Sequence, residues 1–449
     1  MTAAADLLIP RLGPPKVASP LRKFFPGGAD ASHFVAEDAG IVFDVSAADA
    51  DACAERGCSI PALEKAGPRS QIFFDPEETS AAIVTCGGLC PGINDVIRSL
   101  VMTLTYRYGV RRILGIRYGY QGFIREFGHE PVTLKPDDVA DIHRAGGSIL
   151  GTSRGRQDSG LIVDFLNSNK INLLFVIGGD GTQRGALEIA ETAEKRKLNI
   201  SVIGIPKTVD NDILYLDKSF GFDTAVAEAV KAISTAHTEA RAQVGGIGLV
   251  KFMGRHSGFI ASYAALAMND ANFVLIPEIP FELEGPKGLL AALETRLRSR
   301  GHAVILVAEG AGQDLIRQEV QGKDASGNIL FNDIGLFLRE CITAHFSGIG
   351  MEINLKYIDP SYLLRALPAS APDSVYCFRL GQHAAHAAMS GRTKMVVGMR
   401  HRQYVHIPMS LIAKGRKQVD PHSDIWVSVL EATGQPAEMR SHATKDSKR

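Results

Sequence analysis

Short apolar runs alternate with amphipathic segments through most of the chain, and this alternation restricts the possible folds more than any other feature. The apolar runs are AAIVTC, RRILGIR, INLLFVI, ISVIGIP, GIGLVKF, NFVLIP and HAVILVAEG, in that order. The segment after the first run has a helical apolar face made of Ile93, Val96, Ile97, Leu100, Val101 and Leu104. Buried strands that alternate with amphipathic helices are typical of parallel sheets covered on both faces. We therefore predict an α/β fold that binds its ligands at the carboxyl ends of the strands.

Length and charge narrow the class of protein further. A chain of 449 residues is too long for one compact core, so we expect two or three domains. The 49 basic and 49 acidic side chains give a formal net charge of zero, which argues against a general binder of nucleic acid or acidic membranes. The N-terminal residues do not resemble a signal peptide, and no apolar run approaches the roughly 20 residues that span a bilayer. The six cysteines lack zinc-site spacing, so we expect reduced thiols in a cytoplasmic protein.

The first glycine-rich loop, TCGGLCPGIND at 85–95, lies between a strand and the amphipathic helix. Gly87, Gly88 and Gly92, together with the N–H groups at the helix start, are suited to hold a phosphate. No Lys-Ser/Thr pair follows, so the loop is not a Walker A motif. A tight turn with a purely structural role is the alternative.

The second loop, GGDGTQRG at 178–185, combines glycines suited to phosphate with the carboxylate of Asp180. A nucleoside triphosphate arrives with Mg²⁺, which prefers oxygen ligands and is often held by one or two carboxylates plus the phosphates. Asp180 is therefore a candidate magnesium ligand. The alternative is that Asp180 caps the helix that follows.

The third loop, GIPKTVDNDI at 204–213, carries Lys207, Thr208, Asp210 and Asp212 directly after a strand. Two carboxylates beside a lysine suit acid–base chemistry on a charged substrate, because a general base must reach a hydroxyl while cations neutralise the phosphoryl group. The alternative is a turn rich in Asp and Asn with solvated charges.

Four further motifs lie near predicted strand ends. The loop ILGTSRGRQD offers Arg154, and KFMGRHSGF places Arg255 and His256 at a predicted helix start, where an anion is favoured. LVAEGAG leaves Glu309 free to accept hydrogen bonds from sugar hydroxyls. KYIDPSYLLRA brings two cations and a phenol close together in the sequence, a combination that can bind phosphate. Helix caps and surface ion pairs are the alternatives.

Taken together, these motifs resemble the phosphofructokinase family. The segments GGLCPGIN, GTSRG, GGDGT, PKTVDND, KFMGRHSG, VAEGAG and KYIDPSYLLRA occur in that family's order, over about residues 78–400. GGDGT alone also occurs in lipid and NAD kinases, whereas PKTVDND followed by MGRHSG is far more specific. The resemblance is strongest to the long-chain, ATP-dependent branch that is related to pyrophosphate-dependent enzymes. It implies two Rossmann-like α/β domains with mainly parallel sheets and an active site in the cleft between them.

The resemblance implies a role for each matching residue in transferring the γ-phosphoryl of ATP to the 1-hydroxyl of fructose 6-phosphate. Asp210 is the general base, supported by Lys207, Thr208, Asp212 and Arg255, and Asp180 binds Mg²⁺. The ATP-binding residues are Gly88, Arg154, Gly179, Gly181, Thr182 and Gly185. The substrate-binding residues are Thr208, Asp210, Met253, Gly254, Arg255, Glu309, Lys356, Tyr362 and Arg365. Tyr362 stands where the family has a His, and Ser159 where it has a second donor-site Arg. An arginine expected shortly before GIGLV has no clean match, and its role is not transferred to Arg241.

The family pattern also implies a domain division and an oligomer. It predicts an N-terminal extension of loops and short elements at 1–77 and a discontinuous nucleotide-binding domain at 78–225 and about 367–433. A fructose 6-phosphate-binding domain follows at 226–366, and a flexible tail at 434–449. The family often supplies one arginine across a subunit interface, which implies a homo-oligomer, a dimer or tetramer.

The phosphoryl donor can be argued from two positions. Pyrophosphate-using relatives carry Asp where this chain has Gly181, and a carboxylate there would repel the α-phosphate of a nucleotide. They also carry Lys at the position of Lys207, and this match favours pyrophosphate as the donor. We give Gly181 more weight, since steric and charge exclusion is harder to evade than an additional cation, and we predict ATP.

Other functions remain open on the sequence. They are a pyrophosphate-dependent fructose 6-phosphate 1-phosphotransferase, a kinase acting on NAD or a lipid, and a non-catalytic sugar-phosphate sensor. A dinucleotide-binding oxidoreductase fits less well, because the glycines are spaced GxGxxxG instead of GxGxxG.

Overall fold

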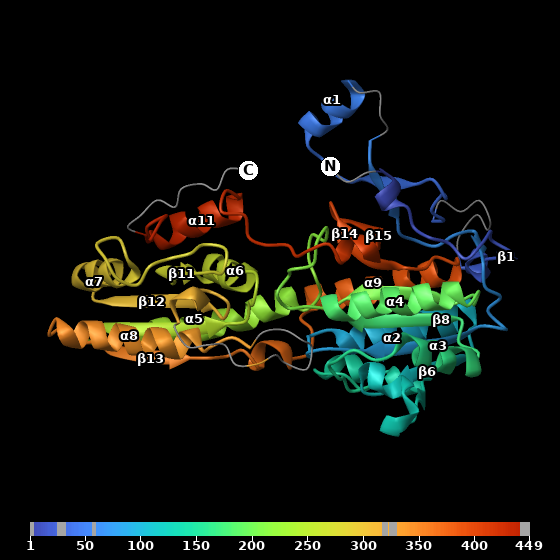
Figure 1. Cartoon of the computed structure of the whole chain (residues 1–449), viewed down its shortest axis with the longest axis horizontal. Coiled ribbons are helices and arrows are strands. Elements are labelled where there is room, and N and C mark those ends of the chain that lie inside the picture. Colours follow the sequence, from blue (N-terminus) through green and yellow to red (C-terminus); the bar gives the residue numbers. More distant parts are fainter. Residues whose placement is uncertain (1–3, 25–32, 56–59, 317–321, 323–329, 441–449) are drawn as a thin grey trace. The chain divides into compact units, whose positions relative to one another are not determined.

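The computed structural model describes residues 4–24, 33–55, 60–316, 322 and 330–440 (Figure 1). The chain forms two compact units. The first contains residues 1–208, 213–221 and 366–416, and the second contains 209–212, 222–365 and 417–449. No helix within the described residues is long and apolar enough to cross a membrane.

The first unit is built on a nine-stranded sheet. Its strand order is β2 (Gly40–Val42), β3 (Ala62–Lys65), β15 (Gln403–Pro408), β14 (Met395–Arg400), β9 (Ser201–Pro206), β8 (Leu173–Gly178), β5 (Ser80–Thr85), β6 (Arg112–Ile116) and β7 (Val132–Thr133). The five strands from β14 to β6 are parallel. Strands β8 and β9 are completely buried, which explains their continuous apolar sequence.

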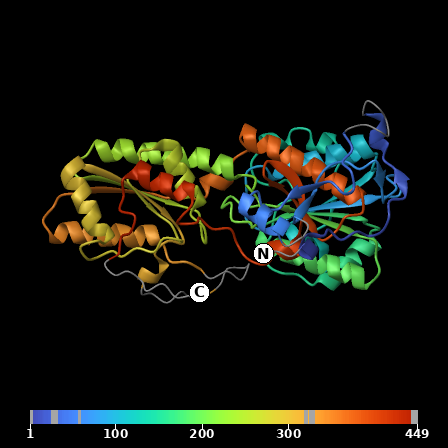
Figure 2. The ribbon, with the colours of Figure 1, turned by 90° about the horizontal axis from the view of Figure 1, so that it is seen from above.

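Helices cover both faces of this sheet (Figure 2). The apolar sides of α3 (Ser159–Ser168) and α4 (Asp180–Lys195) form one core with the strands. On the other face, α2 (Ile93–Thr103) packs against α9 (Ala371–Met389). Ser99 of α2 donates a hydrogen bond to the Phe378 carbonyl oxygen at 2.5 Å.

The second unit contains a four-stranded parallel sheet in the order β11 (Phe273–Leu275), β12 (His302–Ala308), β10 (Gly246–Phe252) and β13 (Asn354–Ile358). On one face, α7 (Leu289–Arg300) and α8 (Ile334–Gly348) share a core with β10 and β12. On the other face, α5 (Phe222–Arg241) approaches β10 so closely that a Cβ on Gly248 would lie 2.8 Å from Ala236. Helix α6 (Phe259–Met268) packs on α5 and on α11 (Asp424–Thr433). The two sheets confirm the α/β prediction.

The C-terminal segment differs from the sequence-based expectation. Residues 417–433 were expected with the first domain, but they lie in the second unit, where α11 contacts α6 and β11. Residues 434–440 were expected to belong to a flexible tail. Instead, the Gln435 side chain accepts a hydrogen bond from Val274 N–H at 2.6 Å, and Met439 is buried in the core. Residues 441–449 of that predicted tail lie outside the described residues.

The N-terminal extension contributes two strands to the large sheet and several short elements. The latter are η1 (Ala4–Leu7), β1 (Val17–Ala18), η2 (Pro20–Lys23), α1 (Ala47–Glu55) and β4 (Gln71–Ile72). Glu64 of β3 forms ion pairs with Arg69 and Arg392, and it makes a hydrogen bond with Nδ1 of His406 at 2.7 Å, because burial lowers the pKa of His406 to about 4. Arg392 and His406 lie far from Glu64 in the sequence. These contacts fasten the extension to the rest of the unit. Cys86, Cys90, Cys341 and Cys377 are outside disulfides, but Cys53 is in a disulfide, so the expectation of reduced thiols is wrong there.

A buried histidine makes the stability of the first unit depend on pH. His386 of α9 is buried, and its Nδ1 lies 2.8 Å from the Tyr108 hydroxyl. Burial, with the charge of Arg69 adding to it, lowers the pKa of His386 from 6.5 to about 3. Below its normal pKa, the unfolded chain therefore binds a proton that the folded chain does not bind. Stability should fall with decreasing pH by up to about 1.4 kcal/mol per unit from this residue.

Urea unfolding of wild type and His386→Gln from pH 7 to about pH 5 would measure this effect. We expect the variant to lose part of the pH dependence. The matched control His422→Gln alters an exposed histidine and should keep it. Equal pH dependence in wild type and His386→Gln would show that this histidine does not carry the effect.

Candidate active site

The glycine loops of the first unit meet at the carboxyl ends of three neighbouring parallel strands, β5, β8 and β9. Gly87 N–H donates to the Ser153 carbonyl oxygen at 3.0 Å, and the Thr152 hydroxyl donates to the Gly87 carbonyl oxygen at 2.6 Å. Lys207 N–H donates to the Gly178 carbonyl oxygen at 3.0 Å. The structure thus brings together four motifs that are widely separated in the sequence.

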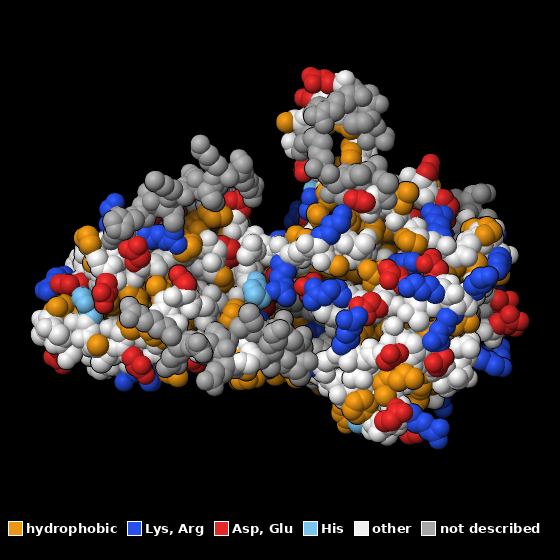
Figure 3. Space-filling view, in the orientation of Figure 1, with side chains coloured by type: hydrophobic (Ala, Val, Ile, Leu, Met, Phe, Trp, Pro, Cys, Tyr) orange, Lys and Arg blue, Asp and Glu red, His pale blue; other side chains and the backbone are white. Residues whose placement is uncertain are grey.

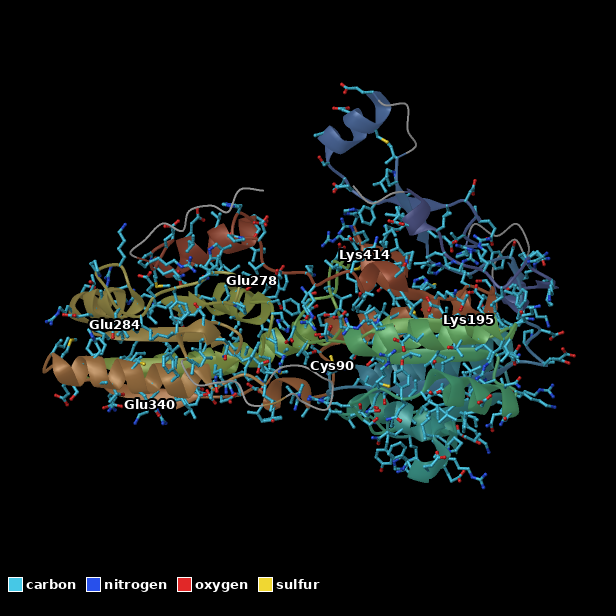
Figure 4. All side chains as sticks on the ribbon, in the orientation of Figure 1. Cys90, Lys195, Glu278, Glu284, Glu340 and Lys414 are labelled. Atoms are coloured by element: carbon cyan, nitrogen blue, oxygen red, sulfur yellow. The ribbon has the colours of Figure 1, made fainter. Side chains whose placement is uncertain are left out.

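The first glycine loop has a backbone that only glycine accommodates easily. Gly92 has φ +98°, and a Cβ there would lie 2.4 Å from the Cys377 sulfur. Cys90, labelled in Figure 4, lies in the same loop, and its thiol contacts the Phe220 carbonyl oxygen at 3.2 Å. The buried Lys207 ammonium donates to the Gly88 carbonyl oxygen at 2.5 Å. Lys207 therefore places a positive charge at the predicted phosphate cradle.

Asp180 is the first residue of α4, and Gly179 is its N-cap. The alternative in which Asp180 caps the helix is therefore wrong. Its carboxylate lies 3.4 Å from Arg184 and 3.3 Å from Arg416, and Arg416 was not foreseen as a neighbour. A single carboxylate beside loops that are predicted to bind phosphate fits the donor set of Mg²⁺, which often completes its coordination with phosphate oxygens and water. Within the described residues, no group of three or more His, Cys, Asp or Glu side chains could hold a metal.

The remaining predicted donor residues lie on α4 and on the neighbouring loop. Gly181 is exposed, and a Cβ there would meet only Arg184, at 3.9 Å. Gly185 has a packing reason to be glycine, because a Cβ would lie 2.9 Å from the Tyr120 ring. The Tyr120 hydroxyl donates to the Thr182 carbonyl oxygen at 2.8 Å, and Arg154 is exposed in its loop.

The PKTVDND segment has a firmly held backbone. The Thr208 carbonyl oxygen accepts a hydrogen bond from the Ser219 hydroxyl at 2.7 Å. Two residues later, the Asp210 carbonyl oxygen accepts from the Ser257 hydroxyl at 3.0 Å. The Asp212 carbonyl oxygen accepts from Lys417 N–H at 2.8 Å. The half-buried Asp210 side chain is therefore carried by a segment that its own backbone contacts hold in place.

In the second unit, the loops after β10 and β12 are joined through their backbones. Glu309 N–H donates to the Phe252 carbonyl oxygen at 2.9 Å, and Gly310 N–H donates to the Gly254 carbonyl oxygen at 3.1 Å. Gly254 has φ +131°, where a Cβ would lie 2.4 Å from the Ser257 carbonyl oxygen. The structure thus brings the loop of Met253, Gly254 and Arg255 beside Glu309.

The Glu309 carboxylate lies in a cationic environment. Burial raises the pKa of Glu309, and the nearby charges of Arg255 and Lys251 oppose this rise. The Arg255 guanidinium lies over the Phe331 ring, 4.6 Å from its centroid. A carboxylate between cations can accept hydrogen bonds from neutral hydroxyl groups, while the cations attract an anionic group on the same ligand.

Tyr362 and Arg365 are brought together by one short helical turn, η10 (Leu363–Arg365). The Arg365 guanidinium lies 4.6 Å from the centroid of the Tyr362 ring, which is 75% exposed. Lys356, predicted to assist them, lies within β13 opposite Gly248 and is exposed. Lys356 therefore lies two residues before the end of β13, whereas Tyr362 and Arg365 lie in the loop that follows this strand.

A group of charged residues beside this loop was missed by sequence reasoning. Lys251 of β10 forms ion pairs with Asp333 at 2.7 Å and Asp359 at 2.9 Å. The only signal in the sequence was a lysine within the apolar run GIGLVKF. A second missed residue is Glu278, labelled in Figure 4, whose carboxylate accepts from Gly258 N–H and Val419 N–H at 2.9 and 2.8 Å.

Comparison with known proteins identifies the family. The family model for phosphofructokinase matches residues 80–388. The chain belongs to the phosphofructokinase family. Among its relatives, the ATP-dependent 6-phosphofructokinase of Borreliella burgdorferi is 50% identical over 97% of this chain and 98% of that protein. The ATP-dependent 6-phosphofructokinase of Amycolatopsis methanolica is 47% identical over 98% of this chain and 97% of that protein.

Solved phosphofructokinase structures share the fold. The pyrophosphate-dependent phosphofructokinase from Marinobacter aquaeolei superposes with a TM-score of 0.65 at 21% sequence identity. That match covers 82% of this chain and 94% of the other. The likeness confirms the phosphofructokinase fold that the motifs implied.

Basic and acidic side chains are interspersed over the visible face of the molecule, in agreement with the formal net charge of zero (Figure 3). Any site for an anionic ligand must therefore depend on local charges.

Proposed function

We infer that the chain is an ATP-dependent 6-phosphofructokinase, which transfers the γ-phosphoryl of ATP to the 1-hydroxyl of fructose 6-phosphate in glycolysis. The observation that carries this inference is the set of relatives with that name at 47–50% identity over nearly the whole chain. The product is fructose 1,6-bisphosphate.

We propose that the loops of the first unit bind the donor. Gly88, Arg154, Gly179, Gly181, Thr182 and Gly185 line the phosphates, and Asp180 holds Mg²⁺. When bound, the metal neutralises charge on the phosphoryl oxygens. The Lys207 ammonium, fixed on the Gly88 carbonyl oxygen, adds positive charge where negative charge develops during transfer. The α4 N-terminus contributes its unpaired first-turn N–H groups.

The acceptor is assigned to residues of the third loop and the second unit. Asp210 removes the proton from the 1-hydroxyl, with Thr208 and Asp212 supporting it. Met253, Gly254, Arg255 and Glu309 hold the sugar, and Tyr362 and Arg365 hold the 6-phosphate, with Lys356 assisting. Because this family often completes the phosphate site across an interface, we also propose a homo-oligomer, a dimer or tetramer.

A donor-exchange assay tests the function. Purified protein with fructose 6-phosphate and Mg²⁺ should form fructose 1,6-bisphosphate efficiently with ATP and poorly with pyrophosphate. Chelation of the metal by EDTA should abolish turnover, and added Mg²⁺ should restore it. Efficient turnover with pyrophosphate and little with ATP would instead assign the pyrophosphate-dependent reaction, the alternative favoured by Lys207. Absence of bisphosphate with both donors would favour the sugar-phosphate sensor.

A further inference from the structure

We propose that Lys251 is a positioning residue of the fructose 6-phosphate site, which holds the start of α8 and the loop of Tyr362 and Arg365 against the end of β10. This inference rests on the proposed function and adds a residue to its acceptor site. One ammonium group joins the strand that leads into the MGRHSG loop, the start of α8, and the loop that carries Tyr362 and Arg365.

The Lys251 side chain is only 12% exposed and makes two ion pairs at hydrogen-bond distance. It lies one residue before the end of β10, so Met253, Gly254 and Arg255 follow almost at once. A lysine so placed in a buried strand is costly unless its charge is compensated. Here Asp333 and Asp359 provide that compensation.

Asp333 is the first partner, and it is itself held by three further groups. It is the N-cap of α8 and accepts from Gly335 N–H at 2.9 Å and Leu336 N–H at 3.1 Å. The Tyr357 hydroxyl also donates to it at 3.1 Å. Asp333 is thus a fixed point, and Lys251 ties β10 to it.

Asp359 is the second partner, and it begins the loop that carries the predicted phosphate-binding pair. Its carboxylate accepts from both the N–H and the hydroxyl of Ser361, at 3.1 and 2.5 Å, and so shapes the turn directly before Tyr362. Arg365 lies one turn further on and stacks on Tyr362. Lys251 therefore sets the position at which this turn begins.

Lys251 also controls the local charge. Burial alone would raise the pKa of Asp333 and Asp359, but the Lys251 hydrogen bonds contribute to lowering both. The two groups are therefore carboxylates at neutral pH, and a third, Glu309, lies within the same electrostatic environment. Without the ammonium, Asp333 and Asp359 would lose a compensating positive charge, which would disfavour a phosphorylated sugar nearby, and the turn would lose an anchor.

The test is steady-state kinetics of Lys251→Met. We expect the KM for fructose 6-phosphate to rise about 10- to 100-fold, the size of effect that loss of a charged hydrogen-bonding group produces. The kcat should change by only a few fold, and the KM for ATP should stay near the wild-type value. A residue with a merely structural role would instead alter both KM values or only the thermal midpoint.

Three further variants sharpen the test. Lys251→Arg keeps the charge and should recover much of the affinity. Lys231→Met removes a lysine from an exposed ion pair with Glu228 on α5 and should behave like wild type. In an Asp359→Asn background, Lys251→Met should raise the KM less than it does in wild type, because one of the two carboxylates that Lys251 compensates is already neutral. If Lys251→Met does not fold, Asp359→Asn and Lys251→Arg still report on the same KM.

Two results would overturn the proposal. One is an unchanged KM for fructose 6-phosphate in folded Lys251→Met, and the other is full additivity in the double variant. Failure of the proposed function differs from failure of the Lys251 proposal. In the former case, the wild-type chain itself would show no ATP-dependent formation of the bisphosphate.

Discussion

Replacing Asp210 by Ala should lower kcat by about 10²- to 10⁴-fold, the usual contribution of a positioned general base. The KM values for ATP and fructose 6-phosphate should change little, because the proton is removed only during transfer. The backbone at this position should persist in the variant, since it is the Asp210 carbonyl oxygen, not the carboxylate, that accepts the Ser257 hydrogen bond at 3.0 Å.

Asp210→Asn provides the matched comparison. It keeps the shape of the side chain but cannot accept the proton as a carboxylate does, so it should lose nearly as much activity as Asp210→Ala. A coupled assay of bisphosphate formation gives both constants. If either variant keeps its turnover and loses only affinity, Asp210 binds the sugar and another group is the base.

Gly181→Asp should raise the KM for ATP by about 10²-fold or more, since opposed like charges at a binding site cost several kcal/mol and each 1.4 kcal/mol is tenfold. The fold should tolerate the change. Gly181 is exposed on α4, its φ is not in the left-handed region, and a Cβ there meets only Arg184 at 3.9 Å. The loss should therefore reflect repulsion of the nucleotide phosphates by the new carboxylate.

Gly181→Ala separates charge from size. Alanine fits the same open space without a charge, so its KM for ATP should remain within a few fold of wild type. Thermal unfolding of both variants would check that they fold. An unchanged KM for ATP in Gly181→Asp would refute the assignment of this position as the one that admits ATP and disfavours pyrophosphate.

The alternation of apolar runs and amphipathic helices predicted much of the fold. The runs INLLFVI and ISVIGIP became β8 and β9, and GIGLVKF became β10 with the same bounds. Short apolar runs locate these strands because the strands are buried on both faces. Five of the loops could be located for the same reason, since GGLCPGIN, GGDGT, PKTVDND, MGRHSG and the loop of Glu309 directly follow buried strands.

The hairpin of β14 and β15 was not predicted, because its turn lacks the usual sequence signal. A two-residue hairpin turn of type I′ requires positive φ at both central positions, and Asn-Gly is a common solution. Here His401 and Arg402 adopt φ values of 50° and 61°. Their neighbours pair along both strands, so tertiary structure holds two residues in a conformation that they seldom adopt by themselves.

The candidate site was foreseen where its residues are local in sequence and missed where distant residues meet. Asp180 could be singled out from its own loop, but its contact with Arg416 spans 236 residues. The same applies to Lys251 and Asp333, which lie 82 residues apart. No spacing rule predicts such a pair. The resemblance supplied roles for residues but not the ion pairs that hold them.

The N-terminal extension has a consequence for how the large sheet ends. Strand β3 pairs with β15, and β2 pairs with β3, so the extension occupies the hydrogen-bonding side that β15 would otherwise present. A chain shortened to begin at β5 would expose that row of N–H and C=O groups as a template for intermolecular pairing. It would also deprive Arg392 and His406 of the Glu64 carboxylate inside the protein. With the extension present, the sheet ends at the three-residue strand β2 instead of the six-residue strand β15, so the extension shortens the edge that the sheet offers for such pairing.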